Sequence, residues 1–353
     1  MDNVSYMQKK DLVSILTPCY NGATLICRLL DSILIQDYQE IEMFVIDDGS
    51  TDHSKEVIES YIQKFSARGY KLNYIYQDNG GQSVAINNGL KLVNGEYLIW
   101  PDCDDWYNSS SAISTMVSEL EKLPNEYAMA RCGSLLIDEV SWNEIRKTPF
   151  NNECLKPNQF LNCLYNQNYF WGAGNYILRM SHFDKVNPTR EIYTEKSAGQ
   201  NWQIHLPVLY SYKVHTITQH LHTILVRSNS HSNKKHNDSG ISRITSYENT
   251  LLNTLQRINE MPQEEKDHHI KEITIQYSLE KLKVLLEAGK YGQVHNYYCK
   301  LKQLKPQNLT KFDSFCLWCS QNAITAFLWY KPGKLGRNVS SKLLYKMKRL
   351  FRI

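Results

Sequence analysis

The chain has 353 residues, 42% of them hydrophobic and 22% charged, a composition typical of globular proteins and a length sufficient for two domains. Its nine cysteines are scattered and odd in number, which argues against a disulfide scaffold. We read no signal peptide at the N-terminus and no run of about 18 uncharged apolar residues that would span a membrane. We therefore expect a cytoplasmic protein with reduced thiols.

Positive charge is concentrated near the C-terminal end of the sequence. The formal net charge is +4, yet residues 331–353 contain eight lysines and arginines and no acidic residue. In a helix, the apolar residues of this segment fall on one side and the basic residues on the other, which suits an anionic membrane surface. The alternative is a helix that packs on the protein with its basic face in solvent. The first interpretation predicts peripheral contact with the inner face of the cell membrane.

The N-terminal part of the chain alternates between strand and helix patterns. Short apolar runs rich in β-branched residues predict strands, and apolar residues repeated at helical spacing predict helices. Ser50 or Thr51 is the expected N-cap of the second helix. This alternation predicts an α/β fold with a mostly parallel sheet and helices on both faces. The expected strands are residues 12–18, 42–48, 71–76 and 96–100, and the expected helices are residues 24–36, 50–65 and 81–93.

The pattern is less regular in the remaining sequence. Residues 111–123 predict a helix and residues 127–138 a strand, both within the same domain. From residue 241 to residue 353 the chain is predicted to be helical, with a break at Ala288–Gly289 that is consistent with a helical hairpin. We therefore expect one α/β domain, residues 1–240, followed by a helical C-terminal region, residues 241–353.

Polar residues lie at the carboxyl end of each of the four expected strands. Ligands bind at the carboxyl ends of the strands in such sheets, and these ends meet at one edge. The four segments together therefore predict a single binding site. They are Thr17 to Asn21, Asp47 and Asp48, Gln77 to Gln82, and Asp102 to Asp105.

Three carboxylates follow the fourth strand: Asp102, Asp104 and Asp105. A turn or helix start would explain Asp104 or Asp105 but hardly Asp102 as well. A general acid/base pair is a second explanation. The third is a divalent cation, Mg²⁺ or Mn²⁺, which would cancel the mutual repulsion and could be shared with a diphosphate. We favour the cation.

The other strand ends offer groups suited to a nucleotide. Asp47 or Asp48 could accept a hydrogen bond from a base or a ribose hydroxyl, and Tyr20 could lie flat against a base. Asn79 and Gln82 could bond a base edge or ribose. The sequence has neither a G-x-G-x-x-G motif after the first strand nor a Walker lysine motif. A metal ion would therefore have to hold the phosphates.

Four segments resemble the motifs of family 2 glycosyltransferases of the GT-A fold, in the same order: "VSILTPCYNG", "FVIDDGSTD", "QDNGGQSVAINNGL" and "GEYLIWPDCDD". The resemblance is close over residues 11–107 and weaker to about residue 230. It implies a GT-A fold with a nucleotide-sugar half, residues 11–107, and an acceptor half, residues 108–240. It also implies transfer of a sugar from a nucleotide-diphosphate donor, usually with inversion.

The resemblance also assigns roles to individual residues. The acidic strand-end motif of the family, here Asp47-Asp48, contacts the nucleotide, and its D-x-D motif, here Asp102 and Asp104, holds Mg²⁺ or Mn²⁺ on the diphosphate. The aromatic residue after the first strand matches Tyr20. The residues expected to bind the nucleotide are Thr17, Tyr20, Asp47, Asp48, Asn79, Gln82 and Asp102.

The sequence departs from the family in two places. Ile86 stands where many members have arginine, and Gln200-Asn201 stands at the catalytic position where inverting members usually carry Glu-Asp. Amides cannot act as general bases near neutral pH. Three readings remain open: another residue serves as base, the acceptor is an anionic phosphate, or the protein is slow or inactive. For the first, Glu195 is favoured over Glu191 and His205.

Other residues are candidates for the acceptor and for the leaving group. Trp171, Trp202 and Asp105 are expected on the acceptor side, with Trp171 stacking on a sugar ring; packing in the core is the alternative for Trp171. Arg227 and His231 lie where such enzymes often close a loop over the diphosphate, and they could stabilise the departing nucleotide. A solvated loop is the alternative there.

We therefore predict metal-dependent, inverting transfer of a sugar, with a UDP-sugar favoured as donor, to a glycan. A lipid-linked acceptor in cell-surface polysaccharide synthesis is expected, and no nucleic-acid partner. The alternative is a sugar-nucleotide-binding protein with little or no catalysis. A phospho-receiver domain fits poorly because a matching lysine is absent, and a dinucleotide dehydrogenase fits poorly because its glycine motif is absent.

Overall fold

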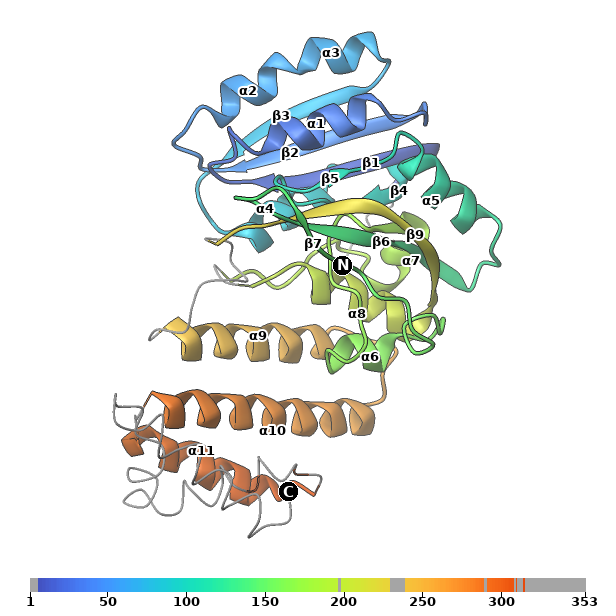
Figure 1. The fold of residues 1–353 in the computed structure, drawn as a ribbon. Coiled ribbons are helices and arrows are strands. Elements are labelled where there is room, and N and C mark those ends of the chain that lie inside the picture. The colour runs from blue at the N-terminus through green and yellow to red at the C-terminus, as the bar shows by residue number, and fades with distance from the viewer. Residues whose placement is uncertain are drawn as a thin grey trace. The chain divides into compact units, whose positions relative to one another are not determined.

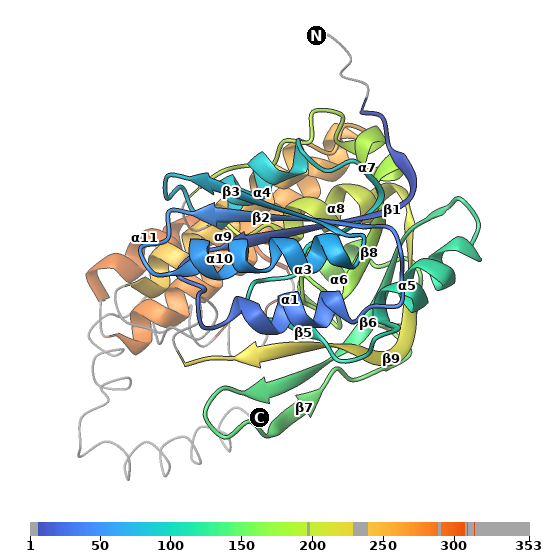
Figure 2. The ribbon, with the colours of Figure 1, turned by 90° about the horizontal axis from the view of Figure 1, so that it is seen from above.

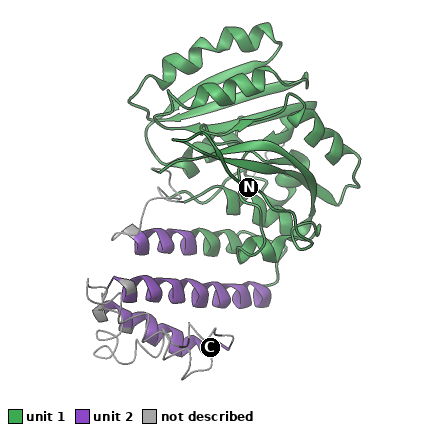
Figure 3. Cartoon of the chain, in the orientation of Figure 1, with its two compact units in different colours: residues 1–234, 250–262 green, residues 235–249, 263–353 purple. Residues whose placement is uncertain are grey.

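The computed structural model describes residues 6–195, 198–228, 239–288 and 291–307, together with Leu309 and Ser314. His231 and residues 331–353 lie outside the described residues. The chain divides into two compact units, shown in Figure 3. Unit 1 contains Met1–Lys234 and Thr250–Pro262, and unit 2 contains Lys235–Asn249 and Gln263–Ile353.

The described part of unit 1 is built on a nine-stranded sheet with the order β3-β2-β1-β4-β8-β6-β9-β5, and β7 pairs with β6 outside this path. Strands β1 to β4 are parallel to one another, as the sequence predicts. Strand β8 then pairs antiparallel with both β4 and β6, and β9 runs parallel to β6. Figure 1 shows this mixed sheet. The strands are β1 (Lys9–Cys19), β2 (Ile41–Asp48), β3 (Lys71–Gln77), β4 (Gly95–Ile99), β5 (Trp106–Tyr107), β6 (Tyr127–Asp138), β7 (Glu144–Lys147), β8 (Tyr176–Arg179) and β9 (Lys213–Val226).

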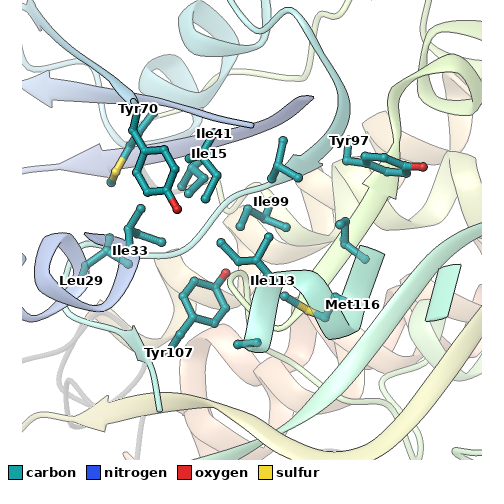
Figure 4. Packing of buried hydrophobic residues seen from close by; sticks show 14 of the residues in the cluster. Ile15, Leu29, Ile33, Ile41, Tyr70, Tyr97, Ile99, Tyr107, Ile113 and Met116 are labelled. Carbon is teal, nitrogen blue, oxygen red and sulfur yellow. The ribbon is translucent and has the colours of Figure 1, made fainter. Parts of the chain in front are cut away.

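Helices cover both faces of the parallel strands because successive side chains of a strand point to opposite faces. On one face, Ile15 of β1 and Ile99 of β4 belong to a buried cluster with Leu29 and Ile113 from two helices (Figure 4). Burying a side chain of this kind contributes about 1.5–3 kcal/mol. The helices of unit 1 are α1 (Ile26–Leu34), α2 (Ser54–Ser60), α3 (Ile62–Ala67), α4 (Gln82–Leu90), α5 (Ala112–Glu121), α6 (Phe160–Leu164), α7 (Met180–Val186) and α8 (Asn201–Ser211).

Helix α4 lies on the opposite face, very close to β1. A Cβ atom added to Gly89 would lie 2.1 Å from Cδ1 of Leu16, the neighbour of Ile15 on the strand. Only a residue without a side chain allows this approach. The first residue of α4 is Gln82, so the packing at Gly89 also fixes where the start of the helix lies relative to the strand ends.

The predicted helix over residues 50–65 is wrong at its start and in its middle. Helix α2 begins at Ser54 with His53 as the N-cap residue, and a second helix, α3, begins at Ile62. Ser50 and Thr51 do not cap it, because both bond to Asn21 in the loop after β1. The Asn21 amide donates to Oγ of Ser50 at 2.9 Å, and Oδ1 of Asn21 accepts from the Thr51 amide at 2.9 Å.

The described part of unit 2 is helical, as predicted. Helix α10 (Gln263–Glu287) ends just before the expected break at Ala288–Gly289, and α11 (Tyr291–Leu304) begins just after it. Helix α9 (Ser239–Gln256) contributes residues to both units. A separate apolar core within unit 2 includes Leu282 and Leu301. None of the helices in the described ranges combines the length and the apolar character that crossing a membrane requires.

Candidate functional site

The carboxyl ends of the parallel strands β1, β2, β3 and β4 lie at one edge of the sheet; Figure 2 shows β1, β2 and β3 from above. Cys19 of β1 pairs with Asp47 of β2, and Asp47 pairs with Tyr76 of β3. Tyr20 follows β1 directly and is 53% exposed, so its ring is accessible to a ligand. Thr17 is fully buried, and its Oγ1 has no hydrogen-bond partner among the described residues.

At the end of β2, the Asp48 carboxylate is surrounded by hydrogen-bond donors from the last residue of β3 and from the loop between β3 and α4. Its Oδ1 accepts from the Gly80 amide at 2.8 Å and from Nε2 of Gln77 at 2.7 Å, and its Oδ2 accepts from the Gly81 amide at 2.8 Å. The Asn79 side chain donates to the carbonyl oxygen of Asp48 at 2.8 Å. Asp48 therefore fixes the loop that leads into α4.

Asp47 makes a similar set of contacts on its other side. Its Oδ2 accepts from the Tyr74 hydroxyl at 2.7 Å, and its Oδ1 accepts from the Ser50 amide at 2.8 Å. Burial, followed by the bond to Asp47, raises the pKa of Tyr74 well above its usual value. Gly49 lies next in the chain with φ of +76°, and a Cβ there would lie 2.8 Å from the Asn79 amide nitrogen, so glycine is required. Both β2 carboxylates thus shape the neighbouring loops.

At the end of β4, the Asp102 carboxylate is held by two side-chain amides. Nε2 of Gln82 donates to Oδ1 of Asp102 at 2.7 Å, and Nε2 of Gln200 donates to the same oxygen at 3.3 Å. Burial and the charge of Asp104 raise the pKa of Asp102 to about 7, because both disfavour its ionised form. Gln82 comes from the first residue of α4 and Gln200 from the residue before α8.

The Asp104 carboxylate is paired with Arg227, which follows the last residue of β9. Nε and Nη2 of the guanidinium lie 2.7 Å and 2.6 Å from Oδ2 of Asp104. Asp104 keeps 14% of its side chain exposed and Arg227 29%, so the pair is partly open to solvent. The two aspartates of the D-x-D motif are therefore stabilised in different ways, one by neutral amides and one by a cation.

Asp105 is turned into the interior. Its Oδ1 accepts from the Leu225 amide at 3.3 Å, and its Oδ2 lies 3.7 Å from Nε2 of the buried His222. Burial, followed by the charge of Asp104, raises the pKa of Asp105 well above its usual range, and burial lowers the pKa of His222 to about 3. These contacts join the D-x-D segment to β9 and favour a structural role for Asp105.

Asp102 and Asp104 are suited to a hard divalent cation. Carboxylate oxygens are the ligands that Mg²⁺ and Mn²⁺ prefer, and two neighbouring buried carboxylates gain from a positive charge. Within the described ranges, no group of three or more His, Cys, Asp or Glu side chains is arranged to hold a metal ion by itself. The pair therefore fits a cation that takes its remaining ligands from water and phosphate oxygens, rather than one enclosed by protein.

Glu195 lies on a segment that is bonded to the start of α4. The Ser83 hydroxyl donates to the Glu195 carbonyl at 2.9 Å, and the Glu195 amide donates back to Oγ of Ser83 at 3.3 Å. Oε2 of Glu195 accepts from the Tyr193 hydroxyl at 2.9 Å. Because Ser83 follows Gln82, this segment is close to the two amides that hold Asp102. The backbone of Glu195 is therefore bonded to the residue that follows Gln82, which itself donates to Asp102.

The other two candidate bases are in less suitable surroundings. Glu191 forms an exposed ion pair with Lys91, with Nζ and Oε1 at 2.9 Å, and this bond lowers the pKa of Glu191. His205 is fully buried, and burial lowers its pKa to about 3. Its Nδ1 lies 3.0 Å from the Tyr169 hydroxyl. Asn201 is turned to the end of β4, where its Oδ1 accepts from Nε1 of Trp100 at 3.2 Å.

Trp171 and Trp202 meet in an aromatic cluster next to His205. Their ring centroids are 5.2 Å apart at 77°, and the Trp171 and His205 rings are stacked with centroids 6.3 Å apart. Nε1 of Trp202 donates to the Cys163 carbonyl at 3.2 Å. Both tryptophans are partly exposed. The rings can therefore pack in the protein and still offer a surface to a sugar.

Arg131, which was not predicted from the sequence, supports this cluster from within. Its guanidinium is fully buried, and it donates to the Tyr176 hydroxyl at 2.9 Å and to Oγ1 of Thr216 at 3.0 Å. It also lies over the rings of Tyr169 and Phe170. In the sequence, Arg131 is the one charged residue inside the apolar run of β6. A buried charge requires compensating contacts, so its position could have indicated a buried polar network.

Comparison with known proteins finds similarity to glycosyltransferases. Residues 14–184 match the family model described as glycosyl transferase family 2. An uncharacterized glycosyltransferase of Rickettsia typhi is 40% identical over 130 residues, which are 37% of this chain and 38% of that protein. The uncharacterized glycosyltransferase EpsJ of Bacillus subtilis is 30% identical over 185 residues, half of each chain. The chain thus matches these relatives over half of their length or less.

The fold agrees with a solved structure over most of the chain. A crystal structure of residues 1–349 of TarS from S. aureus, in complex with UDP-GlcNAc, aligns with a TM-score of 0.60. The alignment covers 90% of this chain and 89% of that chain at 16% sequence identity. The comparison confirms the GT-A type of α/β fold and the helical C-terminal region that the sequence predicts.

Proposed function

Residues 14–184 belong to glycosyltransferase family 2, and from this premise we propose that the chain transfers a sugar from a nucleotide-diphosphate donor to a glycan. The observation that carries the proposal is the pair Asp102 and Asp104 at the strand edge that also carries Tyr20 and the β2 aspartates. A UDP-sugar is the favoured donor, because TarS, which shares the fold, was solved with UDP-GlcNAc.

Asp102 and Asp104 would hold Mn²⁺ or Mg²⁺, and the bound ion would offset negative charge on the departing diphosphate. Arg227 would leave Asp104 and bond to the same diphosphate, since its guanidinium is within reach of the motif. Tyr20 would stack on the nucleotide base. Asp48 contributes indirectly, because it fixes the loop that carries Asn79 and leads to Gln82.

The chemical step is proposed to be a single displacement with inversion at the anomeric carbon. The acceptor hydroxyl gives its proton to Glu195, its oxygen forms the new glycosidic bond, and the bond from the anomeric carbon to the diphosphate breaks with its electron pair on the leaving group. Glu195 is favoured as base because its backbone is bonded to Ser83 at the start of α4. Trp171 and Trp202 would offer their rings to the acceptor glycan.

A donor screen tests this function. Thermal stability and donor hydrolysis would be measured with UDP-, GDP-, CMP- and dTDP-sugars, with and without Mn²⁺, for the wild type, Asp104→Ala and Glu195→Gln. We expect one nucleotide to stabilise the wild type only with Mn²⁺, Asp104→Ala to lose that effect, and Glu195→Gln to keep it while releasing nucleotide more slowly. No stabilisation by any donor would contradict the proposal.

A second candidate function is binding of a sugar nucleotide without catalysis. The observation that favours it is the pair Gln200-Asn201, whose amides cannot take a proton from an acceptor. In the same screen this function predicts metal-dependent stabilisation without nucleotide release, even after glycan acceptors are added. Release that depends on Glu195 would exclude it.

The acceptor is proposed to be a lipid-linked glycan at the inner face of the cell membrane, in cell-surface polysaccharide synthesis. The basic residues of segment 331–353 support this proposal by their charge alone. Liposomes that contain anionic lipids would be sedimented with the full chain and with a chain that ends at residue 330. We expect the shorter chain to remain in solution, and equal sedimentation of both would contradict the membrane contact.

A further inference from the structure

Gln200 and Asn201 stand at the catalytic position of the family, yet both side chains contact the end of β4. Nε2 of Gln200 lies 3.3 Å from Oδ1 of Asp102, and Oδ1 of Asn201 lies 3.2 Å from Nε1 of Trp100. Gln200 is only 2% exposed, so its side chain offers little surface to an acceptor. We propose that Gln200 is a positioning residue that holds Asp102 in the orientation required to bind a divalent cation, an inference that rests on the function proposed above.

The hold on Asp102 comes from two separate elements. Gln82, the first residue of α4, donates to the same Oδ1 at 2.7 Å, and Gln200 precedes α8. Two donors on one oxygen fix the rotation of the carboxyl group. No described residue donates to Oδ2 of Asp102, so this oxygen stays available to a cation. The carboxyl group of Asp102 is thus already ordered before the ion binds, so ordering this group reduces the binding free energy less.

The charge around the motif explains why an amide suits this position better than a carboxylate. Asp104 and Asp105 already place two further carboxylates within three residues of Asp102. A glutamate at position 200 would add another negative charge where the Gln200 amide now donates a hydrogen bond. Gln200, the residue before the position of the usual base, therefore adds a support to the D-x-D motif.

The test is a titration of the full chain with Mn²⁺ alone, with free Mn²⁺ measured by electron paramagnetic resonance. Gln200→Met keeps the length of the side chain and removes its donor. Loss of one hydrogen bond to a carboxylate predicts Mn²⁺ binding about three- to tenfold weaker, and the same for Gln82→Met. In an Asp102→Ala background, Gln200→Met should have no further effect, because the residue that it positions is gone.

Gln203→Met is the matched control. Gln203 is also buried on α8, but its amide donates to the Tyr193 and Gly199 carbonyls, each at 2.9 Å. We expect this variant to melt at a lower temperature and to bind Mn²⁺ like the wild type. If Gln200→Met does not fold, Gln200→Asn replaces it, because its shorter amide stays polar but lies too far from Asp102.

Three outcomes separate the hypotheses. Weaker Mn²⁺ binding by Gln200→Met, with wild-type binding by Gln203→Met, supports the positioning role. Wild-type binding by Gln200→Met, while Asp104→Ala weakens binding about 100-fold, overturns the positioning role and leaves the proposed function intact. Absence of Mn²⁺ binding by the wild type, with and without UDP, overturns the metal site of the proposed function and with it this inference.

Discussion

Aspartates end both β2 and β4, but the two strand ends are built differently. The β2 carboxylates are surrounded by neutral donors, as when Asp48 accepts from two backbone amides and one side-chain amide. At β4, Asp102 has a pKa raised to about 7, and Asp104 is balanced by Arg227. The first arrangement is complete without a ligand and shapes loops. The β4 arrangement would be stabilised by an additional positive charge, so it is suited to binding a cation.

The largest expected effect lies at the β2 end. Asp48→Ala leaves the Gly80 and Gly81 amides without their acceptor, and unpaired amides of this kind cost about 2–4 kcal/mol together. Urea unfolding measures the loss of free energy. Asp48→Asn is the matched variant, since it keeps one carbonyl oxygen and should lose less. Equal stability of Asp48→Ala and the wild type would show that this carboxylate is not structural.

The same substitution at the β4 end should act on binding instead of folding. Asp104→Ala removes one of the two carboxylates proposed to hold the cation, and we expect Mn²⁺ binding to weaken about 100-fold, or about 2.7 kcal/mol. Unfolding in urea should change little, because removing Asp104 also relieves repulsion with Asp102. A large loss of stability with normal Mn²⁺ affinity would reverse the distinction between the two strand ends.

Arg227 offers a test in the opposite direction. Arg227→Gln removes the positive charge that is paired with Asp104, so Mn²⁺ alone should bind about tenfold more tightly at pH 8. Transfer or donor hydrolysis should nevertheless become slower, because the departing diphosphate loses a cation. Calorimetry gives the affinity and nucleotide release gives the rate. Weaker Mn²⁺ binding would show that Arg227 supports the metal site instead of competing for it.

The smallest effect concerns pH and the cluster behind β4. The buried His205 packs against Trp100 with ring centroids 5.4 Å apart, and its pKa is lowered to about 3. In the unfolded chain, His205 binds a proton when the pH falls below its ordinary pKa of about 6.5, whereas in the folded protein it stays neutral. The folded state therefore loses about 1.4 kcal/mol of stability for each pH unit below about 6.5. The raised pKa of Asp102 acts in the opposite direction. Comparison of His205→Phe with the wild type isolates the histidine.

In that comparison, the wild type should lose stability relative to His205→Phe between pH 6.5 and pH 5.5, and the difference should be constant above pH 7. Urea unfolding at each pH gives both values. A difference that stays constant over the whole range would mean that the pKa of His205 is the same in the folded and the unfolded protein.

The sequence was sufficient to predict the four parallel strands and the meeting of their polar ends. Alternating strands and helices leave few ways to connect a parallel sheet, so the segments that contain Gln82 and Asp102 were expected at the same edge. Strands β8 and β9 were harder, because their antiparallel and parallel pairing with β6 depends on contacts between distant residues. The break between α2 and α3 was missed because both carry the same apolar spacing.

At the site, sequence patterns identified residues but not their partners. The two aspartates of the D-x-D motif look equivalent in sequence, yet one is held by Gln82 and Gln200 and the other by Arg227. In the sequence, Gln200 stood out only as part of the pair Gln200-Asn201, whose amides cannot act as general bases. Its contact with Asp102 spans 98 positions of the chain, and no local pattern reports a contact of that range.

A substitution at Gly89 would affect the site although Gly89 does not contact it. It lies seven residues after Gln82 on α4, about 10 Å along the helix, and it leaves no room for a methyl group against Leu16. A larger residue there would lift α4 from β1 and carry the Gln82 amide away from Asp102. Natural variation or directed evolution at this buried position would therefore change the support of Asp102 from a distance, and with it the metal affinity proposed above. A survey confined to ligand-contacting residues would overlook the position.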